Sequence, residues 1–149
     1  MADPADELPQ YVLDTSALLA YIEDEEGADL IEDLLEQAEQ DQLLLLVSFI
    51  TFTEIFYLSL REQGEMVARE RLELLDQLPL IRIESSPSVG LAAGRLKAKF
   101  SISLADSWIA ALAKSSEARL VHKDPEFEAL RDEVELFPLP YKPTQLRSG

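Results

Sequence analysis

Four carboxylate residues occupy comparable places in the sequence: Asp14, Glu54, Asp106 and Asp124. Asp14 and Asp124 each follow a short apolar run of the kind that forms a strand, whereas Glu54 and Asp106 fall in the first turn of expected helices. In an open parallel α/β sheet, ligands bind outside the carboxyl ends of the strands. Three of the four acids should therefore lie on that edge, and Asp106 joins them if its helix also begins there.

Each acid also has an explanation as part of a helix cap. Thr51 and Ser103 stand three residues ahead of two of the acids, in the arrangement of a capping box or close to it. Asp124 precedes Pro125, as an N-cap residue precedes proline at the first helical position, and Asp14 can cap the helix that follows it. The helix dipole stabilises acids at such positions whatever else they do.

The four acids taken together favour a bound cation over capping alone. Carboxylates about 5 Å apart repel by roughly 3 kcal/mol per pair at an effective dielectric constant of 20. Caps of about 1 kcal/mol each do not offset several such pairs, whereas a divalent cation does. All-oxygen ligation suits Mg²⁺ or Mn²⁺ better than zinc. A site of this kind can orient and ionise a water and stabilise charge on a phosphoryl group.

The composition excludes several other chemistries. The 149 residues include no Cys, so zinc-thiolate sites and cysteine nucleophiles are absent, and the one histidine, His122, excludes a multi-histidine metal site. With 13 Lys+Arg against 29 Asp+Glu, the net charge of -16 argues against binding nucleic acid mainly by neutralising phosphates. Bound metal ions, a high-salt cytoplasm or a basic partner segment would each account for this charge.

Apolar periodicity predicts the elements that must position these acids. Short apolar runs predict strands at residues 10–13, 43–47, 80–83, 119–121 and 134–137. Helical spacing predicts helices at 16–22, 27–40, from 51 onward, 65–78, 88–100 and 103–115, with a helical turn at 125–130. This alternation predicts an α/β fold, namely a three-layer α/β/α sandwich around a mostly parallel sheet. We expect one domain at residues 10–137, with loose tails at 1–9 and 138–149.

No targeting or membrane segment is expected. The first nine residues are acidic and lack the basic and apolar regions of a signal peptide. The longest apolar run, 43–50, is far shorter than the ~20 residues of a membrane-spanning helix. We therefore expect a cytoplasmic protein that does not enter a membrane.

Four segments occur in an order that is also found in a known family: Val12-Leu-Asp-Thr-Ser-Ala-Leu-Leu19, Thr53-Glu54-Ile55, Leu104-Ala-Asp-Ser-Trp-Ile-Ala-Ala111 and Leu120-Val-His-Lys-Asp-Pro-Glu-Phe127. They resemble the successive motifs of PIN domains, many of which are ribonuclease toxins of VapBC-type toxin–antitoxin pairs. The resemblance covers about residues 11–137. It implies an α/β/α sandwich, a Mg²⁺ or Mn²⁺ site and endonucleolytic cleavage of RNA. The metal-binding acids of the family match Asp14, Glu54, Asp106 and Asp124.

The resemblance also implies accessory residues, with two departures from the family pattern. Ser16 stands where the family often has a polar helper, and Glu126 stands where it often has an auxiliary metal-binding Asp. The longer carboxylate of Glu126 can still reach a metal or its water. His122 occupies a place that usually holds Thr or Ser. It either contacts an RNA phosphate or is a structural residue beside the end of a strand.

Further residues are candidates for binding RNA or a protein partner. One basic cluster either holds an RNA backbone or is the solvated face of a helix: Arg95, Lys97 and Lys99. In the resembled toxins, the early helices form the groove in which an antitoxin segment docks. Tyr21, Tyr57 and Leu58 would serve that contact or a homodimer.

The sequence thus favours a metal-dependent endoribonuclease, the toxin of a toxin–antitoxin pair. The alternative is a catalytically inert PIN-like module that binds RNA or protein. A third reading is a metal-dependent phosphohydrolase of small molecules. It has less support, because an aspartyl-phosphate enzyme of that type would carry Asp in place of Ser16.

Overall fold

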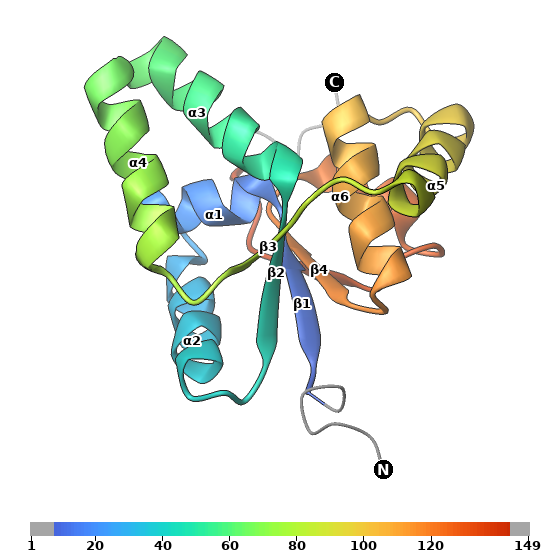
Figure 1. Ribbon diagram of the computed structural model, residues 1–149, viewed down its shortest axis with the longest axis horizontal. Coiled ribbons are helices and arrows are strands. Elements are labelled where there is room, and N and C mark those ends of the chain that lie inside the picture. The colour runs from blue at the N-terminus through green and yellow to red at the C-terminus, as the bar shows by residue number, and fades with distance from the viewer. Residues whose placement is uncertain (1–7, 144–149) are drawn as a thin grey trace.

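The computed structural model describes residues 8–143, and Figure 1 shows its strands and helices. The strands are β1 (Gln10–Leu13), β2 (Leu44–Ser48), β3 (Ile81–Ile83), β4 (Arg119–His122) and β5 (Leu136–Pro138). The helices are α1 (Thr15–Ile22), α2 (Ala28–Glu39), α3 (Phe49–Gln63), α4 (Glu65–Gln77), α5 (Pro87–Lys99), α6 (Leu104–Ser115) and the short 3₁₀ helix η2 (Pro125–Leu130). The predicted α/β fold is confirmed, and the elements differ from their predicted spans mainly at the ends.

The five strands form one sheet in the order β3-β2-β1-β4-β5, with every neighbouring pair parallel. Val12 in the central strand pairs with Leu46 on one side and Leu120 on the other. The chain runs from β1 outward to β3 and then returns to add β4 on the opposite side of β1. The strand order therefore reverses between β1 and β4, and ligands of open α/β sheets bind at such a switch point.

Helices cover both faces of the sheet, which explains why its central strands are continuously apolar. Val12 and Leu120 pack toward α5 and α6, whereas their neighbours Leu13 and Val121 pack toward the α1–α4 side. Figure 1 shows α1–α4 on the left of the sheet and α5 and α6 on the right. The molecule is thus an α/β/α sandwich, and the carboxyl ends of its strands lie at one edge between the two helical layers.

The chain beyond β5 differs from the loose tail predicted at residues 138–149. Leu139 is 2% exposed, and its N–H donates to the carbonyl of His122 at 2.7 Å. Tyr141 donates a hydrogen bond to Glu128. The packed part of the chain therefore extends past β5, because the residues that follow continue its pairing with β4. The rest of the predicted tails, residues 1–7 and 144–149, lies outside the described residues.

Among residues 8–143, no helix combines the length and the apolar character needed to cross a membrane.

Candidate metal centre

Asp14 lies at the carboxyl end of the central strand and is almost completely buried. Its N–H donates to the carbonyl of Val121 at 2.9 Å, so it continues the pairing of β1 with β4. Its Oδ2 accepts hydrogen bonds from the backbone N–H of Ser16, at 2.9 Å, and from the Ser16 hydroxyl. Asp14 is thus the predicted N-cap of α1. Burial, together with the charges of Glu54 and Asp124, raises the pKa of Asp14 to about 7.

The second oxygen of the same carboxylate, Oδ1 of Asp14, is buried and has no hydrogen-bond partner among the described residues. A buried carboxylate oxygen without a partner is costly, because its desolvation is not compensated. This oxygen is therefore a position at which a cation or a water would be stabilising.

Three carboxylates approach one another beside Asp14. Single oxygen atoms of Asp106, Asp124 and Glu126 all lie within 4.8 Å of each other. Asp124 caps η2, since its Oδ1 accepts from the N–H of Glu126 at 3.0 Å. Asp106 stands in the first turn of α6, where its N–H donates to the N-cap hydroxyl of Ser103 at 3.0 Å. This set of oxygen atoms has the spacing and the chemistry to hold a divalent cation.

Burial and the neighbouring negative charges both disfavour ionised carboxylates in the acidic cluster. The pKa of Asp106 is raised to about 8, first by burial and then by the negative charges of Asp14, Asp124 and Glu54. All four acids predicted from the sequence therefore lie close enough to influence one another. Without a cation, Asp14 and Asp106 therefore bind protons at neutral pH more readily than ordinary aspartates do.

The contacts that hold Glu54 near the cluster were not predicted from the sequence. Helix α3 begins at Phe49, capped by Ser48, so Glu54 stands in its second turn and the expected capping box with Thr51 is wrong. Thr51 and Glu54 instead share one face of the helix, where both meet a buried threonine. The hydroxyl of Thr15 donates to Glu54 Oε1 at 2.7 Å and lies 3.2 Å from the hydroxyl of Thr51. The i, i+3 spacing of Thr51 and Glu54 was the available signal.

Capping and clustering are therefore compatible explanations for these acids. Asp14 and Asp124 each cap a helix, and Ser103 caps α6 at Asp106. Helices α1, α6 and η2 all begin at the same edge of the sheet, so the acids at their N-termini lie close together.

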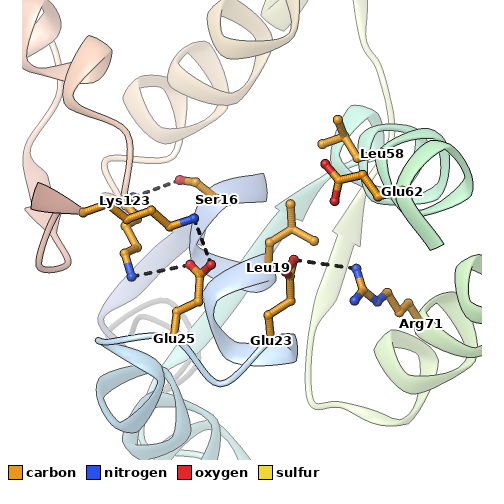
Figure 2. A pocket seen from close by; sticks show the side chains of 9 residues that line it. Ser16, Leu19, Glu23, Glu25, Leu58, Glu62, Arg71 and Lys123 are labelled. Atoms are coloured by element: carbon orange, nitrogen blue, oxygen red, sulfur yellow. Dashed lines mark hydrogen bonds and ion pairs between the residues drawn. The ribbon is translucent and has the colours of Figure 1, made fainter. Parts of the chain in front are cut away.

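Ser16 and Lys123 connect the cluster to the α1–α2 turn. The Ser16 hydroxyl donates to Asp14 and accepts from the N–H of Lys123 at 2.9 Å. Lys123 is only 4% exposed, and its Nζ lies 3.4 Å from Glu25 and 2.7 Å from the carbonyl of Glu26. Figure 2 shows Lys123 and Glu25 facing each other beside Ser16. This buried lysine was not identified as a candidate from the sequence.

A cavity of about 210 Å³ adjoins the cluster at Ser16 (Figure 2). Two leucines give it an apolar wall, and six charged residues of both signs surround the rest. Its lining consists of Ser16, Leu19, Glu23, Glu25, Leu58, Glu62, Arg71, Lys123 and Lys142.

His122 is fully buried, so the contact with an RNA phosphate that we considered does not hold in this structure. Its Nδ1 accepts from the N–H of Asp124 at 3.3 Å, and its ring centroid lies 5.2 Å from that of Phe127. Burial lowers the pKa of His122, which favours the neutral ring. The second role that we considered, a structural one, agrees with these contacts.

The predicted basic cluster does not reach the acids. Lys97 donates to the carbonyl of Ile102 at 2.7 Å, and Lys99 lies 3.6 Å from Glu133. Glu133 also pairs with Lys114 in the last turn of α6, about 12 Å along the helix axis from Asp106 at 1.5 Å per residue. Arg95 lies beside this group and lines a second cavity with it.

One known family matches most of the chain. The family model described as PIN domain matches residues 11–133. None of the curated proteins searched matches the chain in sequence.

Solved structures share the fold at low sequence identity. VapBC2 from Rickettsia felis, bound to a DNA fragment from its promoter, matches with a TM-score of 0.71 and 19% identity, over 88% of this chain and 99% of that chain. DNA-bound VapBC from Salmonella typhimurium gives 0.70 and 17%, over 88% and 98%. VapC20 from Mycobacterium tuberculosis, described as a sarcin-ricin loop cleaving toxin, gives 0.63 and 13%, over 80% and 93%. Identities this low establish similarity of fold alone.

Proposed function

Because this chain belongs to the PIN domain family, we propose that it is a metal-dependent endoribonuclease, a hydrolase of RNA phosphodiester bonds, and the toxin of a toxin–antitoxin pair. One observation carries the proposal. Four acids from separate parts of the chain lie near one another at the switch point of the sheet, where burial and the charges of the other three raise the pKa of Asp106 to about 8. Such a concentration of charge is costly to the apo fold, so its presence favours a functional role.

The residues of the cluster fit Mg²⁺ or Mn²⁺. They offer only oxygen ligands, and Oδ1 of Asp14, which has no hydrogen-bond partner within residues 8–143, is a buried acceptor. Asp106, Asp124 and Glu126 would hold the ion, and Asp14 and Glu54 would add negative charge and further oxygen ligands. When bound, a divalent cation supplies positive charge that stabilises the phosphoryl group and favours ionisation of the attacking water.

The protein's own groups fix the carboxylates in place. Ser16 holds one oxygen of Asp14, and Thr15 holds one oxygen of Glu54, so neither carboxylate must be ordered when the substrate binds. Glu126 is exposed at the rim of the cluster. It is therefore the acid best placed to act as the auxiliary ligand or to accept a hydrogen bond from a water that enters with the RNA.

RNA is the substrate class that we propose. The PIN fold includes a structure described as a sarcin-ricin loop cleaving toxin, which supports RNA among phosphodiesters. The net charge of -16 means that the metal would supply most of the positive charge near the scissile phosphate. Arg95 remains the proposed contact to the RNA backbone away from the site, whereas Lys97 and Lys99 have partners within the protein.

An antitoxin is the protein partner that we propose. We also propose that the protein is cytoplasmic, where it would meet both this partner and its RNA. Solved relatives of the fold are VapBC complexes, which supports a partner of that kind. The cavity beside Ser16 combines the apolar walls of Leu19 and Leu58 with several acids, as an amphipathic basic segment would require. Tyr21 and Tyr57 lie on α1 and α3 and would extend this contact, or would contact a second copy of the chain.

Cleavage of a labelled RNA panel tests the proposed function. We expect wild type to cut RNA with Mg²⁺ or Mn²⁺ but not with EDTA, and Asp106→Asn to be inactive while folded. Asp33→Asn is the matched control, because Asp33 is exposed on α2 and its substitution changes the net charge equally. Cleavage that survives in both Asp14→Asn and Asp106→Asn would exclude the site. RNA binding without metal-dependent cleavage would favour the inert module.

A further inference from the structure

The residues after β5 form a strap, defined here as residues 139–143, that lies against the acidic edge. Leu139 continues the pairing with β4 and is buried in the core on the α1–α4 side. Gly27 in the α1–α2 turn has a φ of 102°, and a Cβ there would stand 3.2 Å from Cβ of Leu139 and 3.3 Å from Pro140. The strap is thus closely packed between β4 and the α1–α2 turn.

Tyr141 in this strap contacts both ends of the segment that carries two metal-ligand candidates. Its ring centroid lies 6.0 Å from that of His122, with an interplanar angle of 39°. Its hydroxyl donates to Oε1 of Glu128 at 3.1 Å. Asp124 and Glu126 lie between these two contact points along the chain. One side chain therefore bridges the turn on which both carboxylates stand.

His122 transmits the contact to the first of these carboxylates. Its Nδ1 accepts the N–H of Asp124, and its ring packs on Phe127 as well as on Tyr141. The imidazole is thus held between the strap and the turn. A small Thr or Ser at this position would leave the Tyr141 ring without this partner, so the histidine and the tyrosine act as a unit.

The Tyr141 hydroxyl is a stable donor in this arrangement. Burial and the neighbouring carboxylate of Glu128 raise the pKa of Tyr141, so the hydroxyl remains protonated. The matched part of the family model ends at residue 133, before the strap begins. Tyr141 therefore lies outside the region by which the family is identified, although its partners His122 and Glu128 lie inside it.

We propose that Tyr141 is a positioning residue, which clamps the 122–128 segment so that Asp124 and Glu126 face Asp106 at metal-binding distance. This inference rests on the proposed metal site. Residues that orient the ligands of a metal typically change its affinity by 10–100-fold when they are replaced. A tyrosine that only stabilised the fold would lower the melting temperature and leave metal affinity unchanged.

Mn²⁺ binding, measured by the loss of the free-ion electron paramagnetic resonance signal, tests the clamp on the full chain. We expect the Mn²⁺ Kd to rise about tenfold in Tyr141→Ala. Tyr141→Phe keeps the ring but loses the hydrogen bond to Glu128, and we expect a rise of about threefold. Tyr11→Ala is the matched control, since Tyr11 is another half-buried tyrosine, on β1, and should keep the wild-type Kd.

The outcomes separate this inference from the proposed function. If wild type does not bind Mn²⁺, the proposed metal site fails, and the clamp with it. If wild type binds and both Tyr141 variants keep its Kd while melting earlier, the residue is only structural and the clamp alone is refuted. Should Tyr141→Ala fail to fold, Tyr141→Phe decides, because it removes a single oxygen atom.

Discussion

Replacing Asp106 with Asn should stabilise the metal-free protein while it removes metal binding. The pKa of Asp106 is about 8 in the folded protein, against an ordinary value of 3.8. At pH 7 the unfolded chain therefore ionises this group while the folded chain keeps it protonated. Because pH 7 lies about three units above the ordinary pKa, keeping the proton in the folded state costs roughly 4 kcal/mol at 1.36 kcal/mol per unit. Asn has no proton to lose, so the cost disappears.

The observed gain should be smaller than this upper bound. Water and neighbouring side chains relax around a carboxylate that is not fully buried, and the Asn amide needs partners of its own. We therefore expect the free energy of unfolding of Asp106→Asn to exceed that of wild type by about 2 kcal/mol at pH 7. For a chain of this length, that corresponds to a rise in melting temperature of about 6 °C.

Thermal unfolding in EDTA, followed by circular dichroism, measures this effect. Asp33→Asn is the control for net charge, and as an exposed substitution it should melt within about 2 °C of wild type. With Mn²⁺ the order should reverse, because a ligand that binds only the folded state stabilises wild type alone. If Asp106→Asn melts at or below wild type in EDTA, then burial and the neighbouring acids do not disfavour the ionised Asp106 carboxylate, which contradicts this prediction.

Three further predictions concern the same edge. In EDTA, wild type should melt at higher temperature as the pH falls from 8 to 5.5, since the raised pKa values of Asp14 and Asp106 make the folded state bind more protons over this window; Asp106→Asn should show a smaller slope in the same melts, and an equal slope would contradict this assignment. Mn²⁺ affinity of wild type should weaken as the pH falls, by about tenfold to a hundredfold per pH unit below pH 7, because one or two protons must leave Asp106 and Asp14 when the ion binds. A Kd that stays constant with pH in isothermal titration calorimetry would contradict this. Thr15→Val removes the hydrogen bond to Glu54 with little change in shape, and RNA cleavage should fall about tenfold without a loss of stability above ~1 kcal/mol; unchanged cleavage would show that Glu54 needs no anchor.

The fold was predictable because its signals are local and repeated. Continuous apolar runs such as the one at β2 predict strands covered on both faces, and both core clusters contain residues of that strand. Helix starts were harder to predict. Ser48 both ends β2 and caps α3, so the helix begins earlier than the periodicity from Thr51 indicated, and this shift moves Glu54 into the second turn.

The candidate site was predictable in its acids but not in their supports. A strand end followed by an acid is visible in the sequence, and the parallel topology gathers such acids at one edge. The bonds that fix them join distant segments, as when Lys123 donates its N–H to Ser16 across 107 residues. Leu139 and Tyr141 follow prolines that suggested a tail, and only the pairing of β5 with β4 brings them back to the edge.

The most direct test of the central claim is an anomalous difference map from crystals of the protein soaked in Mn²⁺. We expect a peak within about 2.5 Å of carboxylate oxygens of Asp106 and Asp124, at the edge where β1 and β4 end. The same map from Asp106→Asn should lack that peak. A fully soaked wild-type crystal with no peak there, or with one only at surface acids elsewhere, would contradict the claim that this edge is a metal site.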